Sequence, residues 1–250
     1  MKAIAPTPAE TSLIERRPYD LLSGDERGWL KARHHISFVN RGADEPQRWG
    51  TLCAWNDDEI APDSGFPMHP HSNMEIITYV REGSLTHRDS LGNVGKIEAG
   101  DVQVMSAGTG IRHAEYNLQR TPLRLFQIWI LPDRAGNAPA WGTKPFPKEG
   151  RTDRFVTLAS GFPEDSDALP IRARARVLGA TLRSGEVLRY SLLPERLSYL
   201  VVARGELVVN GILLHERDGA AIRGVSSIAV QATHEAEVVV VDVPPEAGAP

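Results

Sequence analysis

Cysteine is nearly absent from the sequence, because Cys53 is the only one among 250 residues. A single cysteine excludes a disulfide within the chain and any zinc site built from several thiolates. It fits a reducing compartment, and residues 1–12 lack the apolar core of a secretory signal peptide. We therefore expect a cytoplasmic protein that begins with a flexible leader of residues 1–12.

Long apolar runs and blocks of one charge are absent as well. No segment approaches the ~18 uninterrupted apolar residues of a membrane-spanning helix, so no membrane association is expected. The 28 Lys and Arg residues are interleaved with 32 Asp and Glu residues, for a formal net charge of −4. Nucleic-acid-binding proteins typically have a clustered basic face. Direct binding to nucleic acid is therefore not expected, and a role at DNA would need a protein partner.

Short strands separated by turn residues are the dominant pattern. The 22 Gly and 18 Pro residues separate short β-branched and aromatic runs, which is typical of an all-β sandwich or barrel. Helical periodicity is weak, and the best short candidate for a helix is 25–33. The expected strands are 76–80, 84–89, 102–106 and 123–131 in the first half and 187–193, 199–203, 206–210, 228–232 and 237–243 in the second.

The two halves repeat one pattern of strands and turns. Gly83 in the first half and Gly205 in the second each precede a hairpin, after which an Asp and a Gly lead into another strand. Asn210-Gly211 is a strong hairpin signal, since both residues tolerate positive φ. A Pro- and Gly-rich segment separates the halves. We predict two tandem β-domains, residues 13–135 and 151–250, joined by a connector at residues 136–150.

Two of the eight histidines, His69 and His71, stand two residues apart, and His113 and Glu115 have the same spacing. Side chains at i and i+2 of a strand point to the same face, with their roots roughly 6 to 7 Å apart. Each pair can therefore converge on one metal ion. A single His-x-His pair is more often an exposed polar face, but two such pairs favour a metal site. Pro70 between the histidines indicates an edge strand or a loop entrance.

Other residues compete with these pairs or could support them. Glu75 lies four residues after His71, in phase with it on a continuing strand, and competes with Glu115 for the place of a fourth ligand. His34 and His35 cannot face the same way in an extended segment, and His34 is a candidate to support the ligands. His87 is interpreted as a solvent-facing residue of a strand, and His215 and His234 as surface or structural histidines.

The same residues resemble the two cupin motifs. The first motif, G-(X)3-H-X-H-(X)3-E-(X)7-G, runs from Gly65 to Gly83, and the second, from Gly100, includes His113. More narrowly, residues 66–117 are similar to the pirin family, and to its bacterial members in particular. The similarity extends to GWLKARHHISF (28–38) and QIWILP (127–132), and it continues through the second half to residue 244.

The resemblance implies a bicupin, an all-β protein of two jelly-roll-like barrels, with one mononuclear divalent metal in the first barrel and none in the second. The implied ligands are His69, His71, His113 and Glu115. Glu75 and His34 are then candidates that support the ligands. Iron(II) is the expected metal, and Mn, Co, Ni, Cu or Zn also suit three imidazoles and a carboxylate. Arg33 and the Arg-rich segment 172–177 depart from the family pattern. These departures concern the shape of the pocket and its substrate preference, and not the metal.

The implied activity is that of quercetin 2,3-dioxygenases, which bacterial pirins resemble: cleavage of a flavonol such as quercetin by dioxygen. Glu115 would act as the catalytic base that takes the 3-hydroxyl proton of this small aromatic substrate. The alternative is a non-enzymatic, iron-binding redox sensor or transcriptional co-regulator, which would act through a protein partner. A monomer is expected for a chain with two barrels.

Overall fold

The computed structural model describes residues 12–37 and 48–246, so residues 1–11 of the predicted leader lie outside the described part of the chain. Within these ranges all the long elements are strands, and the helical pieces are two 3-10 turns, Tyr19–Leu21 (η1) and Lys148–Arg151 (η2). The predicted all-β class is therefore confirmed. Among the described residues, no helix has the length and apolar character needed to cross a membrane.

The short helix considered at 25–33 is wrong. This segment forms a hairpin of β2 (Gly24–Arg27) and β3 (Leu30–Ile36). In β3 the apolar Leu30 and Ala32 are buried, while Lys31 between them is exposed. Burial with a period of two residues is that of a strand and not that of a helix.

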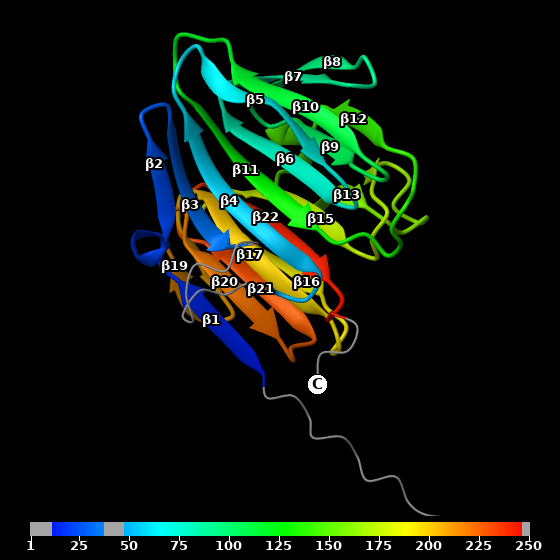
Figure 1. Cartoon of the computed structure of the whole chain (residues 1–250). Coiled ribbons are helices and arrows are strands. Elements are labelled where there is room, and N and C mark those ends of the chain that lie inside the picture. Colours follow the sequence, from blue (N-terminus) through cyan, green and yellow to red (C-terminus); the bar gives the residue numbers. More distant parts are fainter. Residues whose placement is uncertain (1–11, 38–47, 247–250) are drawn as a thin grey trace, which may run out of the picture.

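The first half of the fold is a sandwich of two antiparallel sheets (Figure 1). The larger sheet has the order β12-β9-β6-β11-β4-β3-β2, and the smaller sheet has the order β5-β10-β7-β8. The strands not yet bounded are β4 (Leu52–Ile60), β5 (Ser64–His71), β6 (Glu75–Glu82), β7 (Ser84–Asp89), β8 (Val94–Glu98), β9 (Val102–Ser106), β10 (Ile111–Asn117), β11 (Leu123–Ile130) and β12 (Ala140–Lys144).

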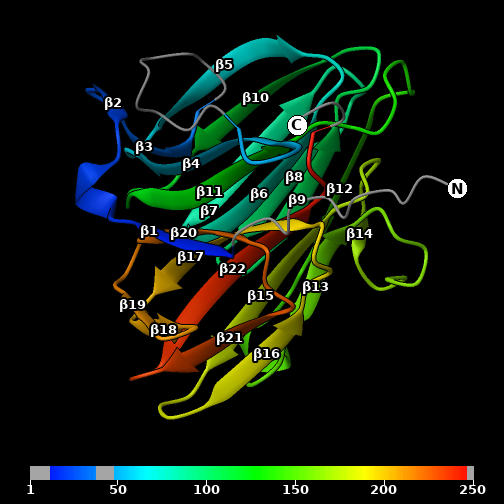
Figure 2. The same ribbon diagram turned by 90° about the horizontal axis from the view of Figure 1, so that it is seen from below.

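The second half has a seven-stranded and a four-stranded sheet again, with the orders β1-β20-β17-β22-β15-β13-β14 and β16-β21-β18-β19. Figure 2 shows these strands below those of the first half. Their bounds are β1 (Leu13–Arg17), β13 (Val156–Ser160), β14 (Leu169–Pro170), β15 (Arg176–Leu182), β16 (Val187–Ser191), β17 (Leu197–Arg204), β18 (Leu207–Val209), β19 (Ile212–Leu214), β20 (Gly219–Arg223), β21 (Ser227–Ala232) and β22 (Ala236–Val243).

The two halves repeat one topology. Strands β6 to β11 of the first half correspond in order and pairing to β17 to β22 of the second. Gly83 and Gly205 occupy the equivalent turn after the first strand of each series, with φ values of 82° and 80° that favour glycine. Each half is a jelly-roll-like sandwich whose sheets do not close into a continuous hydrogen-bonded barrel. The predicted architecture of two tandem cupin-type domains is confirmed.

Two strands pair across the predicted domain limits. β1 pairs with β20 of the second half, and β12, which lies within the predicted connector at 136–150, pairs with β9 of the first half. The limits 13–135, 136–150 and 151–250 remain a proposal, in which β1 and β12 are edge strands added from outside each repeat.

The largest apolar core lies between the two seven-stranded sheets. It joins Ile77 and Tyr79 of β6 to Val201 of β17 and Val239 of β22. The interior of the second half is filled by another apolar cluster, which includes Leu200 and Val238. The interior of the first half is different, because its apolar side chains form two separate clusters. Polar side chains are buried on the same strands, among them Thr78, Gln103, Glu115 and Gln127.

Candidate metal centre

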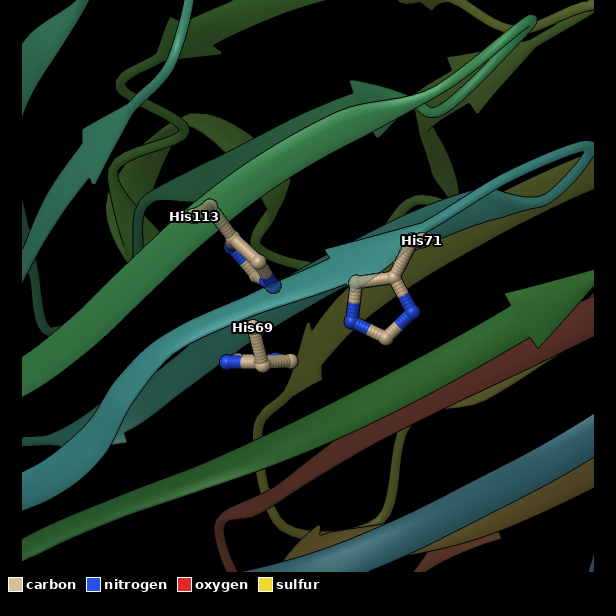
Figure 3. Close-up of side chains that lie close together, drawn as sticks. All are labelled: His69, His71 and His113. Carbon is tan, nitrogen blue, oxygen red and sulfur yellow. The ribbon is translucent and has the colours of Figure 1, made fainter.

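Strands β5 and β10 bring three histidines together. His69 and His71 lie on β5, and His113 lies on β10 opposite His69. Their ring centroids are 4.4 to 5.0 Å apart, and Figure 3 shows the three rings grouped around a common space. One ligand atom from each of the three lies within 4.8 Å of the others. The His-x-His pair and His113 thus form one cluster.

A β-bulge sets the direction of the two histidines on β5. From His113 to Glu115 β10 advances two residues, whereas β5 advances three between their partners, His69 and Phe66. Pro67 lies inside this bulge, where its missing N–H is tolerated, and β5 is an edge strand of its sheet, as Pro70 predicts. The Pro67 carbonyl accepts a hydrogen bond from Nδ1 of His69 at 2.7 Å. Nε2 of His69 then carries the lone pair.

The cluster fits a divalent transition metal. Metal–nitrogen bonds of about 2.1 Å at angles of about 90° put imidazole centroids ~4.5 Å apart, which matches the observed spacing. Both ring nitrogens of His113 are buried without a hydrogen-bond partner, and a bound ion would provide a partner for one of them. Burial lowers the pKa of His71 to about 4 and that of His113 to about 2, so both are neutral near pH 7. Metal binding requires the neutral form.

Glu115, the fourth expected ligand, lies deeper than the histidines of β5. It is 1% exposed, and its carboxylate groups with His113 rather than with the pair on β5. Its two oxygens accept hydrogen bonds from Nε2 of Gln103 at 2.5 Å and Nε2 of Gln127 at 2.8 Å. Burial raises the pKa of Glu115 to about 7, although both amides act to lower it. The site therefore contains a buried carboxylate that can change its protonation near neutral pH.

Two tryptophans fix the orientation of these amides. The indole N–H of Trp141 donates to Oε1 of Gln103 at 2.9 Å, and that of Trp129 donates to Oε1 of Gln127 at 3.1 Å. An indole N–H can only donate, so each glutamine must turn its NH2 group toward Glu115. Sequence reasoning missed both glutamines. The available signal was a glutamine between apolar residues of a strand, in VQVMS (102–106) and LFQIWI (125–130).

His87 is buried, so the prediction that it faces solvent is wrong. It is 0% exposed, its Nε2 lies 3.1 Å from Asp89, and its ring stacks on Trp141 with centroids 4.9 Å apart. The physical reason is the two-residue period of β7, which places Leu85, His87 and Asp89 together on the buried face. β7 pairs with β10, and this register puts His87 opposite Glu115.

The two candidates for supporting residues have other partners. The buried carboxylate of Glu75 accepts hydrogen bonds from Ser106 Oγ at 2.6 Å and from the backbone N–H of Arg172 at 3.1 Å. Nδ1 of His34 lies 2.9 Å from Oδ1 of Asn56. Among the described residues, neither Glu75 nor His34 belongs to a group of potential metal ligands. Their support of the metal ligands remains a prediction.

Comparison with known proteins finds relatives along almost the whole chain. A family model described as Pirin matches residues 16–130, and one described as quercetinase C-terminal cupin domain matches residues 157–243. The chain belongs to the pirin family. A pirin-like protein from Caulobacter vibrioides is 59% identical over 230 residues, which cover 92% of this chain and 99% of that protein. A quercetin 2,3-dioxygenase from Escherichia coli is 36% identical over 219 residues, which cover 87% of this chain and 93% of that enzyme.

Solved structures of a bacterial pirin share the fold. YhhW from Escherichia coli matches with a TM-score of 0.87 and 34% identity, and the match covers 93% of this pirin and 98% of that chain. The complex of YhhW with nickel(II) matches with a TM-score of 0.86, at 34% identity, over 93% of this pirin and 100% of that chain. Together with the histidine cluster, the nickel complex points to a single metal site in this pirin.

Proposed function

We propose that this pirin is a metal-dependent dioxygenase that cleaves flavonols such as quercetin with dioxygen. The observation that carries the proposal is the cluster itself, in which three histidines converge and the carboxylate of Glu115 lies behind one of them. The relative from Escherichia coli that is named quercetin 2,3-dioxygenase supports it.

We assign a divalent ion, in the first instance Fe(II), to four ligands: His69, His71, His113 and Glu115. Three imidazoles and a carboxylate also suit Mn, Co, Ni, Cu or Zn. When bound, such an ion supplies a Lewis acid that lowers the pKa of a substrate hydroxyl, and a redox-active metal also supplies electrons to dioxygen.

Glu115 takes the proton of the flavonol 3-hydroxyl. A carboxylate that lies beside the histidine cluster is suited to act as a general base for a substrate held there. Gln103 and Gln127 present only N–H groups to it, so they hold the carboxylate in place while a second lone pair on each oxygen stays available for the proton.

Aromatic rings line the half-buried side of the cluster. The Phe66 ring lies 6.1 Å from that of His69, and the Trp129 ring lies 5.0 Å from that of His71. An open depression beside His71 is lined by Pro70, Ser72, Ser90, Gly110, Ile111 and Arg112. A flat aromatic substrate would approach the histidines beside the rings of Phe66 and Trp129, and these rings would exclude water from the hydroxyl that loses its proton.

The test compares metal-free protein with the same protein loaded with Fe(II), each mixed anaerobically with quercetin and then exposed to oxygen. We expect oxygen uptake and flavonol loss over many turnovers only in the loaded protein. Glu115→Gln is expected to abolish turnover. The control variant Glu98→Gln, at an exposed residue of β8, is expected to retain it.

Two results contradict the proposal. Equal oxygen uptake by metal-free protein would refute metal-dependent catalysis. Flavonol consumption that stops at one equivalent per protein would favour the non-enzymatic redox sensor.

A further inference from the structure

His113 and Glu115 on β10 have neighbours on two sides, and the proposed ligand set uses only the side of β5. β10 lies between β5 and β7. On the β7 side, Asp89 is paired with His113, and His87 is paired with Glu115. Ligand atoms of His87, His113 and Glu115, the inner group, all lie within 4.8 Å of one another. The ligand atoms of His69, His71 and His113, the outer group, also lie within 4.8 Å of one another, and the two groups share His113.

The hydrogen bonds of His87 leave one ring nitrogen ready for a ligand. Nε2 lies 3.1 Å from Oδ2 of Asp89. The same carboxylate accepts hydrogen bonds from the backbone N–H groups of Leu91 and Asn93 and from the side-chain amide of Asn93. An ionised carboxylate only accepts, so Nε2 carries the proton and Nδ1 carries the lone pair. Nδ1 of His87 is buried and has no hydrogen-bond partner.

This arrangement is typical of a metal-bound histidine. Such histidines almost always donate their other ring N–H to a carboxylate, a backbone carbonyl or water, which fixes the tautomer and the ring direction. His69 of the outer group has the same arrangement through the Pro67 carbonyl. Trp141 stacks on His87 at an interplanar angle of 12° and holds the plane of the ring. A buried histidine with a purely structural role would more often have both nitrogens bonded.

We propose that His87, His113 and Glu115 form an inner binding position for the divalent ion, alternative to the outer position. A neutral imidazole has one lone pair, so His113 binds an ion in one position at a time and the chain holds one ion. All three inner ligands are buried, whereas His69 and His71 are half-buried. An ion in the inner position is shielded from solvent, and an ion in the outer position is open to it. The inference rests on the metal of the proposed function and not on dioxygenase activity.

Cobalt(II) binding to the full chain separates the two positions. Wild-type protein freed of metal is expected to bind one Co(II) by equilibrium dialysis and elemental analysis. The double variant His69→Ala/His71→Ala lacks the outer pair and is expected still to bind one Co(II), more weakly and with a different visible spectrum. Adding His87→Ala is expected to weaken this binding at least about tenfold. Adding His234→Ala instead, at an exposed histidine, is expected to leave it unchanged.

The results distinguish the two proposals. A folded double variant that binds no Co(II), while the wild type binds one, overturns the inner position and leaves the proposed function intact. The inner position is also overturned if adding His87→Ala to the double variant leaves its Co(II) binding unchanged. Absence of binding to the wild type overturns the metal in both proposals. If circular dichroism shows the double variant unfolded, His71→Ala with and without His87→Ala replaces it, and equal affinities and spectra overturn the inference.

Discussion

The buried His35 is expected to make the protein less stable in acid. His35 lies at the junction of the two halves, where its ring contacts Trp55 of β4 and Tyr199 of β17. It is 0% exposed, Nδ1 lies 3.3 Å from the Tyr199 hydroxyl, and Nε2 has no hydrogen-bond partner. Burial lowers the pKa of His35 from 6.5 to about 3; the Asp57 carboxylate acts to raise it, and the cations Arg17, Arg217 and Arg81 act to lower it further. The folded protein therefore excludes a proton that the unfolded chain binds.

The sign and size of the loss of stability follow from this difference in proton binding between the folded and unfolded states. Above pH 6.5 neither state binds the proton, so His35 has no effect on the pH dependence of stability. As the pH falls from 6.5 toward 3, the unfolded chain gains the proton and the folded protein loses stability by about 1.4 kcal/mol per pH unit. Between pH 6.5 and 4.5 the loss from this residue is on the order of 2–3 kcal/mol.

Urea unfolding of metal-free protein at a series of pH values from 7.5 to 4.5 measures this loss. His35→Leu has a side chain of similar size and no proton to gain, so its free energy of unfolding should fall less steeply with pH than that of the wild type. The lost contact to the Tyr199 hydroxyl adds an offset that does not depend on pH. His234→Leu, at an exposed residue, should follow the wild-type curve. Parallel curves for the wild type and His35→Leu would refute the reasoning.

Three further predictions concern the metal, its surroundings and the junction. Saturating metal at 100 times its Kd should stabilise the fold by about 2.7 kcal/mol, seen as a higher Tm that chelation reverses. Trp141→Phe keeps a ring over His87 but frees the Gln103 amide to turn, which would remove its hydrogen bond to Glu115. One hydrogen bond to a charged group is worth about 1.5–3 kcal/mol, so kcat should fall by a factor of roughly 10 to 150 with little change in KM. Arg151→Met removes bonds to Tyr79 and to the buried Glu237, but Lys148 still pairs with Glu237, so the change should cost about 1.5–3 kcal/mol in urea unfolding, and adding Glu237→Leu should restore part of it.

Local patterns predicted much of the fold. Each expected strand overlaps an observed one, because alternating β-branched residues bounded by turn residues form strands. Gly83 and Gly205 correctly indicated the repeat, since both have positive φ at equivalent turns. The pairing of β1 with β20 had no such signal. It joins residues 13–17 to residues 219–223, and nothing local distinguishes that partner from an edge in the first half.

The candidate site could be predicted only in part, because some of its contacts join segments that are distant in the sequence. The i, i+2 spacing places His69 and His71 on one strand face, but the approach of β5 to β10 is a tertiary contact. The sequence does contain a signal for the burial of His87, since this residue is in phase with the apolar Leu85 two residues earlier. The prediction that His87 faces solvent did not use it. A histidine in phase with a buried apolar residue faces the interior, whatever its other neighbours. Gln103 and Gln127 follow the same rule.

The contrast between the two interiors explains how the first half tolerates a polar centre. Thr78, five residues before Gly83, accepts a hydrogen bond from Gln103, whereas Leu200, five residues before Gly205, packs in an apolar core. Buried polar groups stabilise less than apolar groups of the same size. Residues on either side of Thr78 on β6 face the other way, into the large core that both seven-stranded sheets share. That core compensates for the polar interior of the first half, in which the histidine cluster lies.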